Sequence, residues 1–266
     1  MIPLLGRDAA PLLHALAGSS SLLAFDYDGT LAPLVENRRL AALRPRTCSL
    51  LARVCDLYPC AVISGRSRAD VARRLAGTGI KHIIGNHGLE ELERSPRTSP
   101  AVRRARVLLR NSLRGAPGID LEDKGTTLAV HYRHAPDRAR ARAAVLSLLE
   151  PLLPSLRVVG GHQVINVLPA GLKDKGTALA ALWDRLGGDV ALYVGDDLTD
   201  EPAFRLAGVR PLISVHVGAR AESSAGYCLR GQWQVDPLLT RLVNLRRGRT
   251  PGLRGDPLSG IHAPSV

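Results

Sequence analysis

Short apolar runs that alternate with longer helical patterns are the feature of this sequence that most restricts its fold. The runs are rich in Val, Ile and Leu and recur along the chain. This alternation is typical of a parallel sheet covered by helices on both faces. We expect core strands at 21–26, 60–64, 82–85, 190–195 and 212–216, with helices at 45–57, 68–75 and 174–186.

The middle of the chain, from about residue 95 to residue 168, has a different pattern. Two strand-like segments are joined at Lys124-Gly125, which predicts a hairpin because glycine tolerates the positive φ that tight turns require. This pattern indicates a small α+β unit inserted into the α/β core; one continuous sheet is the alternative. The expected elements are a helix at 101–113, strands at 119–123 and 126–133, a helix at 136–149, and strands at 156–159 and 163–168.

The predicted fold class is therefore α/β, with a doubly wound parallel-sheet core and an inserted α+β domain. We assign residues 1–94 and 169–247 to the core and residues 95–168 to the insertion. Residues 248–266 are rich in Gly, Pro and Arg and poor in apolar residues, which predicts a flexible tail.

The formal charge of +12 at pH 7 suggests a nucleic-acid partner, because a basic surface attracts a polyanion. The distribution of the charge argues against one. Arginines are scattered over most predicted helices, and the aromatic residues that could stack on bases make up only 3% of the chain. We expect no specific nucleic-acid partner, and a basic nucleic-acid-binding protein stays as the alternative from another class of function.

The cysteine spacing and the N-terminal residues bear on location. The four cysteines show no Cys-x-x-Cys spacing, and the N-terminus lacks the pattern of a secretory signal. No stretch approaches the roughly 20 apolar residues of a membrane helix. We therefore expect a cytoplasmic monomer with reduced thiols and no membrane partner.

Two of the expected strands lead directly into clusters of acidic residues. The run 22–25 is followed by Asp26-Tyr27-Asp28-Gly29-Thr30, and the run 190–194 by Gly195-Asp196-Asp197-Leu198-Thr199-Asp200-Glu201. In parallel α/β sheets, ligands gather beyond the carboxyl ends of the strands. Clustered carboxylates there suit Mg²⁺, although each cluster taken alone could simply cap the helix that follows.

Two further segments offer groups that bind phosphate. Ser64-Gly65-Arg66 lies between an expected strand and a helix, where a hydroxyl and backbone amides can donate to phosphoryl oxygens. Lys173-Asp174-Lys175 opens the helix before the second acidic cluster, and the chain has only two other lysines, Lys81 and Lys124. One lysine of the pair is expected to neutralise phosphate charge. An ordinary turn and a solvated helix start are the respective alternatives.

These four segments resemble, in order and spacing, the motifs of haloacid-dehalogenase-like phosphatases. Asp26-Tyr27-Asp28-Gly29-Thr30 resembles the first motif, Ser64 the second, Lys175 the third and Gly195-Asp196-Asp197 with Asp200 the fourth. The insertion is placed as in members whose α+β cap closes over the site. Gly85-Asn86-His87-Gly88-Leu89-Glu90 and the second acidic cluster are similar to segments of trehalose-6-phosphate phosphatases, and the resemblance covers residues 22–245.

The resemblance implies that Asp26 attacks phosphorus while Asp28 serves as general acid and then as general base. It implies Mg²⁺ held by the Asp26 carboxylate, the Asp28 backbone carbonyl and Asp196. Ser64 and Lys175 would bind the phosphate oxygens that are not transferred. Thr30, Asp197 and Asp200 are expected to orient these groups.

The same resemblance implies a sugar-binding site shared by the core and the cap. The residues expected to contact the substrate are Arg66, Asn86, His87, Glu90, Glu122, Lys124, His131, Arg133 and Asn166. One departure concerns the sugar: Asn166 and Leu168 stand where the family commonly has a glutamate and a basic residue. An amide binds hydroxyls more weakly than a carboxylate. The alternatives are therefore a phosphatase for another sugar or sugar-acid phosphate and a non-catalytic regulator, the latter disfavoured because all four motifs are present.

Overall fold

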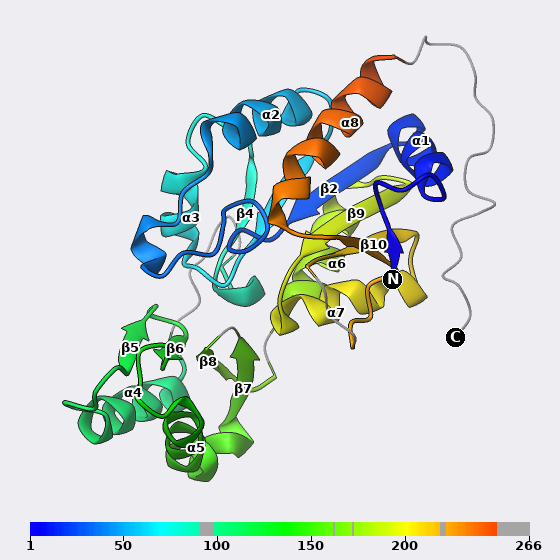
Figure 1. Cartoon of the computed structure of the whole chain (residues 1–266). Helices are drawn as coiled ribbons and strands as arrows, with labels where there is room; N and C mark the ends of the chain where they lie inside the picture. The colour runs from blue at the N-terminus through cyan, green and yellow to red at the C-terminus, as the bar shows by residue number, and fades with distance from the viewer. Residues whose placement is uncertain (91–97, 162, 172, 219–221, 249–266) are drawn as a thin grey trace.

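A computed structural model describes residues 1–90, 98–161, 163–171, 173–218 and 222–248 (Figure 1). Its described part contains two separate sheets, so the alternative of one continuous sheet is wrong. All neighbouring strands in the larger sheet are parallel. Their spatial order is β1 (Ile2–Pro3), β11 (Tyr227–Leu229), β10 (Leu212–Val217), β9 (Val190–Gly195), β2 (Ser21–Phe25), β3 (Cys60–Ile63) and β4 (His82–Ile84).

The larger sheet is buried on both faces because its strands are apolar throughout. In β2, Leu23 and Phe25 belong to one apolar cluster, and Leu22 and Ala24 to the other, as expected when successive side chains point to opposite faces. The first face is covered by α1 (Ala10–Gly18), α2 (Pro45–Cys55), α3 (Arg68–Arg74) and α8 (Val235–Arg247), and the second by α6 (Lys175–Leu186) and α7 (Glu201–Phe204). This confirms the doubly wound core.

Local signals set several of the helix boundaries. Pro45 is the first residue of α2, where its missing N–H costs nothing. Asp174 caps α6 by accepting from the Thr177 N–H, and α6 ends at Gly187, whose φ is 73°. The short strands β1 and β11 and the helices α1, α7 and α8 were not predicted. Strands of two and three residues carry little periodicity, whereas the apolar positions of α8 recur at helical spacing and could have been recognised.

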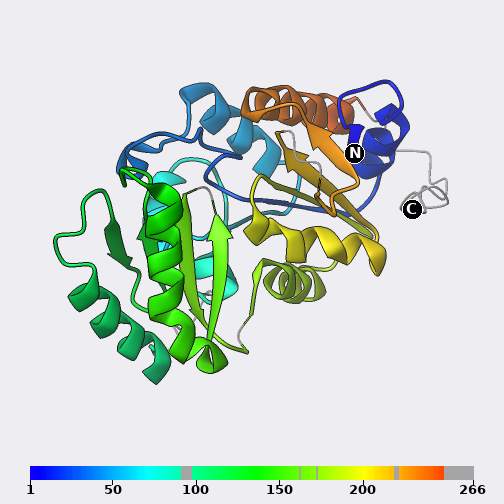
Figure 2. The same ribbon diagram turned by 60° about the horizontal axis from the view of Figure 1, so that its bottom comes forward.

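The smaller sheet lies in the insertion and is antiparallel, in the order β5 (Asp120–Asp123), β6 (Leu128–His131), β8 (Val164–Pro169) and β7 (Leu156–Gly161). Its helices α4 (Pro100–Ser112) and α5 (Arg138–Leu149) pack on one face. In Figure 1 this sheet lies between its own helices and the larger sheet, and Figure 2 shows it from another side. Every element expected in the insertion is present.

The hairpin from β5 to β6 is shorter than predicted. β6 begins at Leu128 rather than at Thr126, because the Thr126 and Thr127 side chains turn toward Asn86 of the core. Gly125 in the turn has a φ of 81°. The exact division into core and cap at residues 94–95 and 168–169 stays a prediction, and the expected tail lies almost wholly outside the described residues.

Candidate active site

The acidic residues lie where neighbouring parallel strands end. β9, β2 and β3 are adjacent, and their carboxyl ends lead into Asp196, Asp26 and Ser64. The backbone N–H of Asp26 donates to the Val194 carbonyl (2.8 Å), which extends the hydrogen-bond ladder of β2 and β9 to Asp26. The sheet topology therefore brings together residues that are far apart in the sequence.

Lys175 joins two of the acids in a buried charge cluster. Its Nζ lies 2.8 Å from Asp26 Oδ1 and 2.7 Å from Asp200 Oδ1. The exposed fractions of these three side chains are 2%, 7% and 0%. Although burial opposes the charge, the two carboxylates raise the pKa of Lys175 above its usual range. Lys175 is thus a permanent cation at the bottom of the site.

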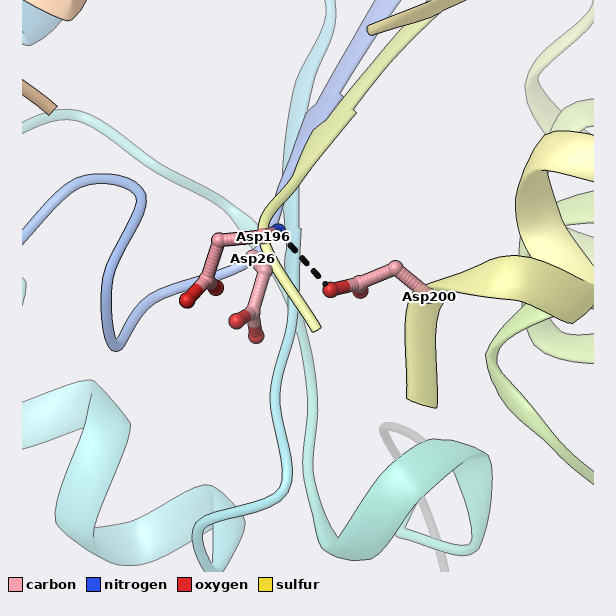
Figure 3. A group of neighbouring side chains, drawn as sticks. All are labelled: Asp26, Asp196 and Asp200. Carbon is pink, nitrogen blue, oxygen red and sulfur yellow. Dashed lines mark hydrogen bonds between the residues drawn. The ribbon is translucent and has the colours of Figure 1, made fainter. Parts of the chain in front are cut away.

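Both carboxylate oxygens of Asp200 accept hydrogen bonds from protein groups. Its Oδ1 also accepts from the Tyr193 hydroxyl (2.7 Å), and its Oδ2 accepts from the backbone N–H groups of Asp196 and Asp197, each at 3.0 Å. Figure 3 shows Asp200 approaching from one side, while the Asp26 and Asp196 carboxylates lie side by side and point the same way. Asp200 therefore orients the other groups.

The donor set fits a metal ion. Carboxylate oxygens of Asp26, Asp196 and Asp200 lie within 4.8 Å of one another, and because the Asp200 oxygens already accept four hydrogen bonds, Asp26 and Asp196 are the carboxylates that could hold a metal ion. Burial, with Lys175 opposing and Asp200 reinforcing it, raises the pKa of Asp26 to about 7. Burial and the neighbouring Asp26 likewise raise the pKa of Asp196. Adjacent acids of this kind are ionised together only when a cation compensates their repulsion.

Gly29 is required by this arrangement. Its φ is 81°, and a Cβ at this position would overlap the Asp196 carboxylate. Thr30, the next residue, donates from Oγ1 to Asp196 Oδ1 at 3.4 Å. The Gly-Thr pair after the first two acids therefore shapes and orients the second acidic cluster.

Asp28 and Arg66 form a bidentate ion pair. Arg66 Nε donates to Asp28 Oδ2 (2.6 Å), and Arg66 Nη2 donates to Asp28 Oδ1 (2.7 Å). Ser64 is buried, and its Oγ accepts from the Arg66 backbone N–H (3.2 Å), which leaves the hydroxyl proton available to a ligand. Arg66, predicted as a substrate ligand, is thus engaged mainly with protein groups.

A cavity of about 670 Å³ opens above these residues, between the core and the insertion. Its lining includes Asp26, Asp28, Lys175 and Asp196 from the core. The insertion contributes Glu122, Lys124, His131, Arg133 and Asn166. The structure therefore brings the predicted cap residues to the same cavity as the acidic cluster.

Glu122, Lys124 and His131 of the insertion form a connected network with Arg38 at this cavity, and Arg133 lines the cavity beside them. The Glu122 carboxylate lies 3.1 Å from His131 Nε2 and 3.3 Å from Arg38 Nη1. Burial opposes ionisation of Glu122, but the His131 hydrogen bond and the nearby Lys124 lower its pKa to about 2. Lys124 Nζ donates to the Gly65 carbonyl (2.7 Å), and Arg133 donates to the Val35 carbonyl (2.9 Å).

His87 and Asn166 lie between the acidic cluster and this network. His87 is buried, and neither ring nitrogen has a hydrogen-bond partner among the described residues; Asn166 approaches the ring without hydrogen-bond geometry. Burial, reinforced by Lys124 and Lys175, holds the pKa of His87 well below its usual range. Burial thus favours the neutral imidazole, whose two nitrogens are buried without a hydrogen-bond partner among the described residues.

Asn86 and Glu90, also predicted as substrate ligands, are not among the residues that line the cavity in the described part of the chain. Asn86 Nδ2 donates to Glu90 (2.6 Å) and Thr126 (2.9 Å), and its Oδ1 accepts from Thr127 (3.1 Å). Glu90 Oε2 accepts from a backbone N–H of α3 (2.6 Å). These contacts join the insertion to the core.

Sequence reasoning missed three residues of the site, namely Arg38, Tyr193 and Gln163. Arg38 lines the cavity from a short 3-10 helix (Arg38–Leu40) and Gln163 from the turn before β8. Neither segment carries a motif, and arginine is too common in this chain to attract attention. Of these three residues, only Tyr193 could have been noticed in the sequence, because its hydroxyl is the one polar side-chain group in an otherwise apolar strand. Asp197, expected to orient neighbouring groups, lines the cavity and caps the turn at Leu198–Asp200, whereas Leu168 is buried in the insertion.

The described residues have the haloacid-dehalogenase-like fold. A solved structure of BT1666 from Bacteroides thetaiotaomicron, described as a phosphatase of that superfamily, matches with a TM-score of 0.59 at 18% identity, covering 85% of this chain and 94% of that one. The C-terminal domain of Candida albicans trehalose-6-phosphate phosphatase matches with a TM-score of 0.77 at 24% identity, covering 92% and 99%. Both likenesses concern the fold.

The family model described as Trehalose-phosphatase matches residues 24–227, and the chain belongs to this family. It is 34% identical over 258 residues to the trehalose-phosphate phosphatase of Mycobacterium tuberculosis, covering 90% of this chain. The chain spans 65% of the length of that relative. Among the described residues, no helix is long and apolar enough to cross a membrane.

Proposed function

We propose that the chain hydrolyses trehalose 6-phosphate to trehalose and phosphate, through an aspartyl-phosphate on Asp26. The observation that carries this proposal is the buried Asp26 carboxylate, 2.8 Å from Lys175, at the bottom of a cavity whose outer wall is the polar network of the insertion. Membership of the Trehalose-phosphatase family and the similarity to the mycobacterial relative support the substrate.

Two parts of the cavity have separate tasks in this proposal. The phosphate end is lined by Asp26, Asp28, Lys175 and Asp196, and the buried Ser64, which is not itself among the lining residues, precedes Gly65 of the lining. The sugar end consists of Glu122, Lys124, His131 and Arg133, with Arg38 beside them, and its charged groups suit sugar hydroxyls. The cavity volume of about 670 Å³ falls within the range of small-molecule sites and accommodates a disaccharide phosphate.

The chemistry follows from the positions of Asp26 and Asp28. A carboxylate oxygen of Asp26 attacks phosphorus, the bond from phosphorus to the sugar oxygen breaks, and Asp28 gives that oxygen a proton. Asp28 then takes a proton from a water molecule that attacks phosphorus, which releases phosphate and restores Asp26. Ser64 and Lys175 donate to the phosphate oxygens that are not transferred.

Mg²⁺ fits the donor set of the phosphate end, with the carboxylates of Asp26 and Asp196 and the Asp28 backbone carbonyl as its protein ligands. When bound, it supplies positive charge that reduces the repulsion between the anionic Asp26 and the anionic phosphate. Asp200 acts here by holding Lys175 and the backbone of the second acidic cluster. Asp197 and Thr30 orient the metal site.

Asn166 favours a second candidate, a phosphatase for another sugar or sugar-acid phosphate. Its side chain is neutral and lies between the phosphate end and the sugar end, where a carboxylate would bind hydroxyls more strongly. The chemistry at phosphorus is the same for both candidates. A monomeric state, a cytoplasmic location and the lack of a specific nucleic-acid partner stay predictions.

Phosphate release from trehalose 6-phosphate and a panel of other sugar phosphates tests these statements. We expect turnover with Mg²⁺, loss of turnover with excess chelator, and a loss of roughly 10⁴-fold or more in Asp26→Asn. Asp56→Asn, which changes an exposed acid after α2, serves as the matched control. Equal turnover by Asp26→Asn contradicts the nucleophile. Cleavage of another sugar phosphate in preference to trehalose 6-phosphate contradicts the sugar alone.

A further inference from the structure

The Arg66 guanidinium connects the carboxylate of Asp28 to a second carboxylate, that of Asp70. Beyond its two bonds to Asp28, Arg66 donates from Nη2 to the Arg38 carbonyl (2.7 Å) and from Nη1 to Asp70 Oδ2 (2.8 Å). Four donor contacts to protein groups leave one of the five guanidinium N–H groups for a ligand. The geometry of Arg66 is therefore suited to holding Asp28 more than to binding phosphate.

Asp70 itself is held from several sides. It lies in the first turn of α3, and its backbone N–H donates to the Ser67 cap (3.3 Å). Its carboxylate accepts from Arg73 (3.1 Å) and Arg74 (2.9 Å) as well as from Arg66. Although burial opposes it, these hydrogen bonds hold the pKa of Asp70 below its usual range. The carboxylate is a fixed, ionised anchor, and it is not among the cavity-lining residues of the described chain.

Asp28 depends on this anchor for its orientation. Its side chain is 34% exposed and lines the cavity, and Arg66 makes every side-chain hydrogen bond to it that the described residues provide. A carboxylate held on one side only by a bidentate fork loses its fixed orientation when the fork moves. The Arg66 side chain would be free to tilt if Asp70 released Nη1.

We propose that Asp70 is a positioning residue for the phosphatase reaction, which fixes Arg66 and, through it, the direction in which the Asp28 carboxylate faces the leaving-group oxygen. The inference rests on the proposed function. It predicts that Asp70 matters most for substrates whose leaving group needs a proton, and least for those whose leaving group departs without one.

The test compares trehalose 6-phosphate with p-nitrophenyl phosphate, whose leaving group is a stable anion. In Asp70→Asn, kcat/KM is expected to fall roughly tenfold or more for the sugar phosphate and less than about threefold for the aryl phosphate. This quantity reports the step in which the leaving group departs. The ratio of the two values, measured on one preparation of the full chain, does not depend on the folded fraction.

Two further variants sharpen the test. Arg73→Ala removes an arginine that bonds the same carboxylate but is 77% exposed, and both kcat/KM values should stay within about twofold. Asp70→Glu restores the charge and should recover part of the selective loss. An equal fall for both substrates, or no fall, in Asp70→Asn overturns the positioning role. Inactivity of the unmodified chain on both substrates overturns the proposed function and this inference together.

Discussion

At the phosphate end of the cavity, the functional side chains emerge where neighbouring parallel strands finish, whereas at the sugar end they come from an antiparallel sheet and a loop. Asp26 and Lys175 are almost completely buried, and backbone bonds of the larger sheet fix the first of them. Glu122 and His131 are about one-quarter exposed and hold each other through side chains. The larger sheet and its backbone hydrogen bonds position the phosphate end. The position of the sugar end depends on the contacts between the insertion and the core.

This difference predicts the largest effect for Lys175→Met. The substitution leaves the buried Asp26 and Asp200 without their cation, so turnover of sugar and aryl phosphates should fall alike, by roughly 10² to 10³-fold. Steady-state kinetics on trehalose 6-phosphate and p-nitrophenyl phosphate would measure it. Lys173→Met, which changes an exposed lysine two residues away, is the matched control and should retain turnover on both. A loss confined to the sugar phosphate would contradict the assignment of Lys175 to the phosphate end.

Asn86→Gly tests the hydrogen bonds of Asn86 that join the insertion to the core. Glycine accepts the φ of 47° found at this position, so the variant removes the hydrogen bonds to Glu90, Thr126 and Thr127 without adding backbone strain. The free energy of unfolding should fall by about 2 to 4 kcal/mol, because buried polar partners are left unsatisfied. Denaturant unfolding measures this change.

The control for Asn86→Gly is Gln163→Gly. Gln163 has a φ of 59°, and its side chain bonds only Arg133 among the described residues, at 3.2 Å. Its replacement should change the free energy of unfolding by less than about 1 kcal/mol. Equal effects of the two variants would show that the free energy of unfolding falls because glycine is introduced at a positive φ, and not because the hydrogen bonds of Asn86 are lost.

Glu122→Gln tests the sugar end alone. The loss of a carboxylate that lines the cavity should raise KM for the sugar phosphate about tenfold and leave the aryl phosphate within about twofold. Asp123→Asn provides the matched control, because Asp123 is the next residue of the same strand and pairs with Arg106 (2.9 Å) outside the cavity lining. An equal change in KM for both substrates would place Glu122 with the phosphate end.

The difference between the two ends of the cavity also explains which parts of the fold and of the site could be predicted from the sequence. Asp26, Ser64 and Asp196 were predictable, because a run of apolar residues indicates a strand and neighbouring parallel strands all end at one edge of the sheet. Lys175, the first residue of α6, was predictable because lysine is rare in this chain. The elements of the insertion were also predictable from their periodicity and from Gly125. The contacts that these elements make with distant parts of the chain were not predictable.

Long-range pairings explain the remaining gaps. Asn86 lies within a motif expected to bind substrate, yet its amide bonds a hairpin about 40 residues further along the chain. Arg38 belongs to a short 3-10 helix in a chain with many arginines, and only the folded structure shows that it meets Glu122. Asp70, by contrast, lies four residues after Arg66, a spacing at which side chains can pair locally. Periodicity indicates which face a side chain occupies and contains no information about such partners.

His87 lies between the two ends, and its burial predicts a modest effect of pH on stability. Its pKa in the folded chain is well below the value of about 6.5 for a solvated imidazole, so below that pH the unfolded chain binds more protons at this site. The contribution of His87 is therefore present above about pH 6.5 and is lost as the pH falls, by up to about 1.4 kcal/mol per pH unit. Denaturant unfolding of the unmodified chain and of His87→Gln at pH 7.5 and 5.5 measures it. The difference in unfolding free energy between the two should shift in favour of His87→Gln at the lower pH. A constant difference would mean that the imidazole accepts a proton in place, and His87 would then belong with the ionised network of the sugar end.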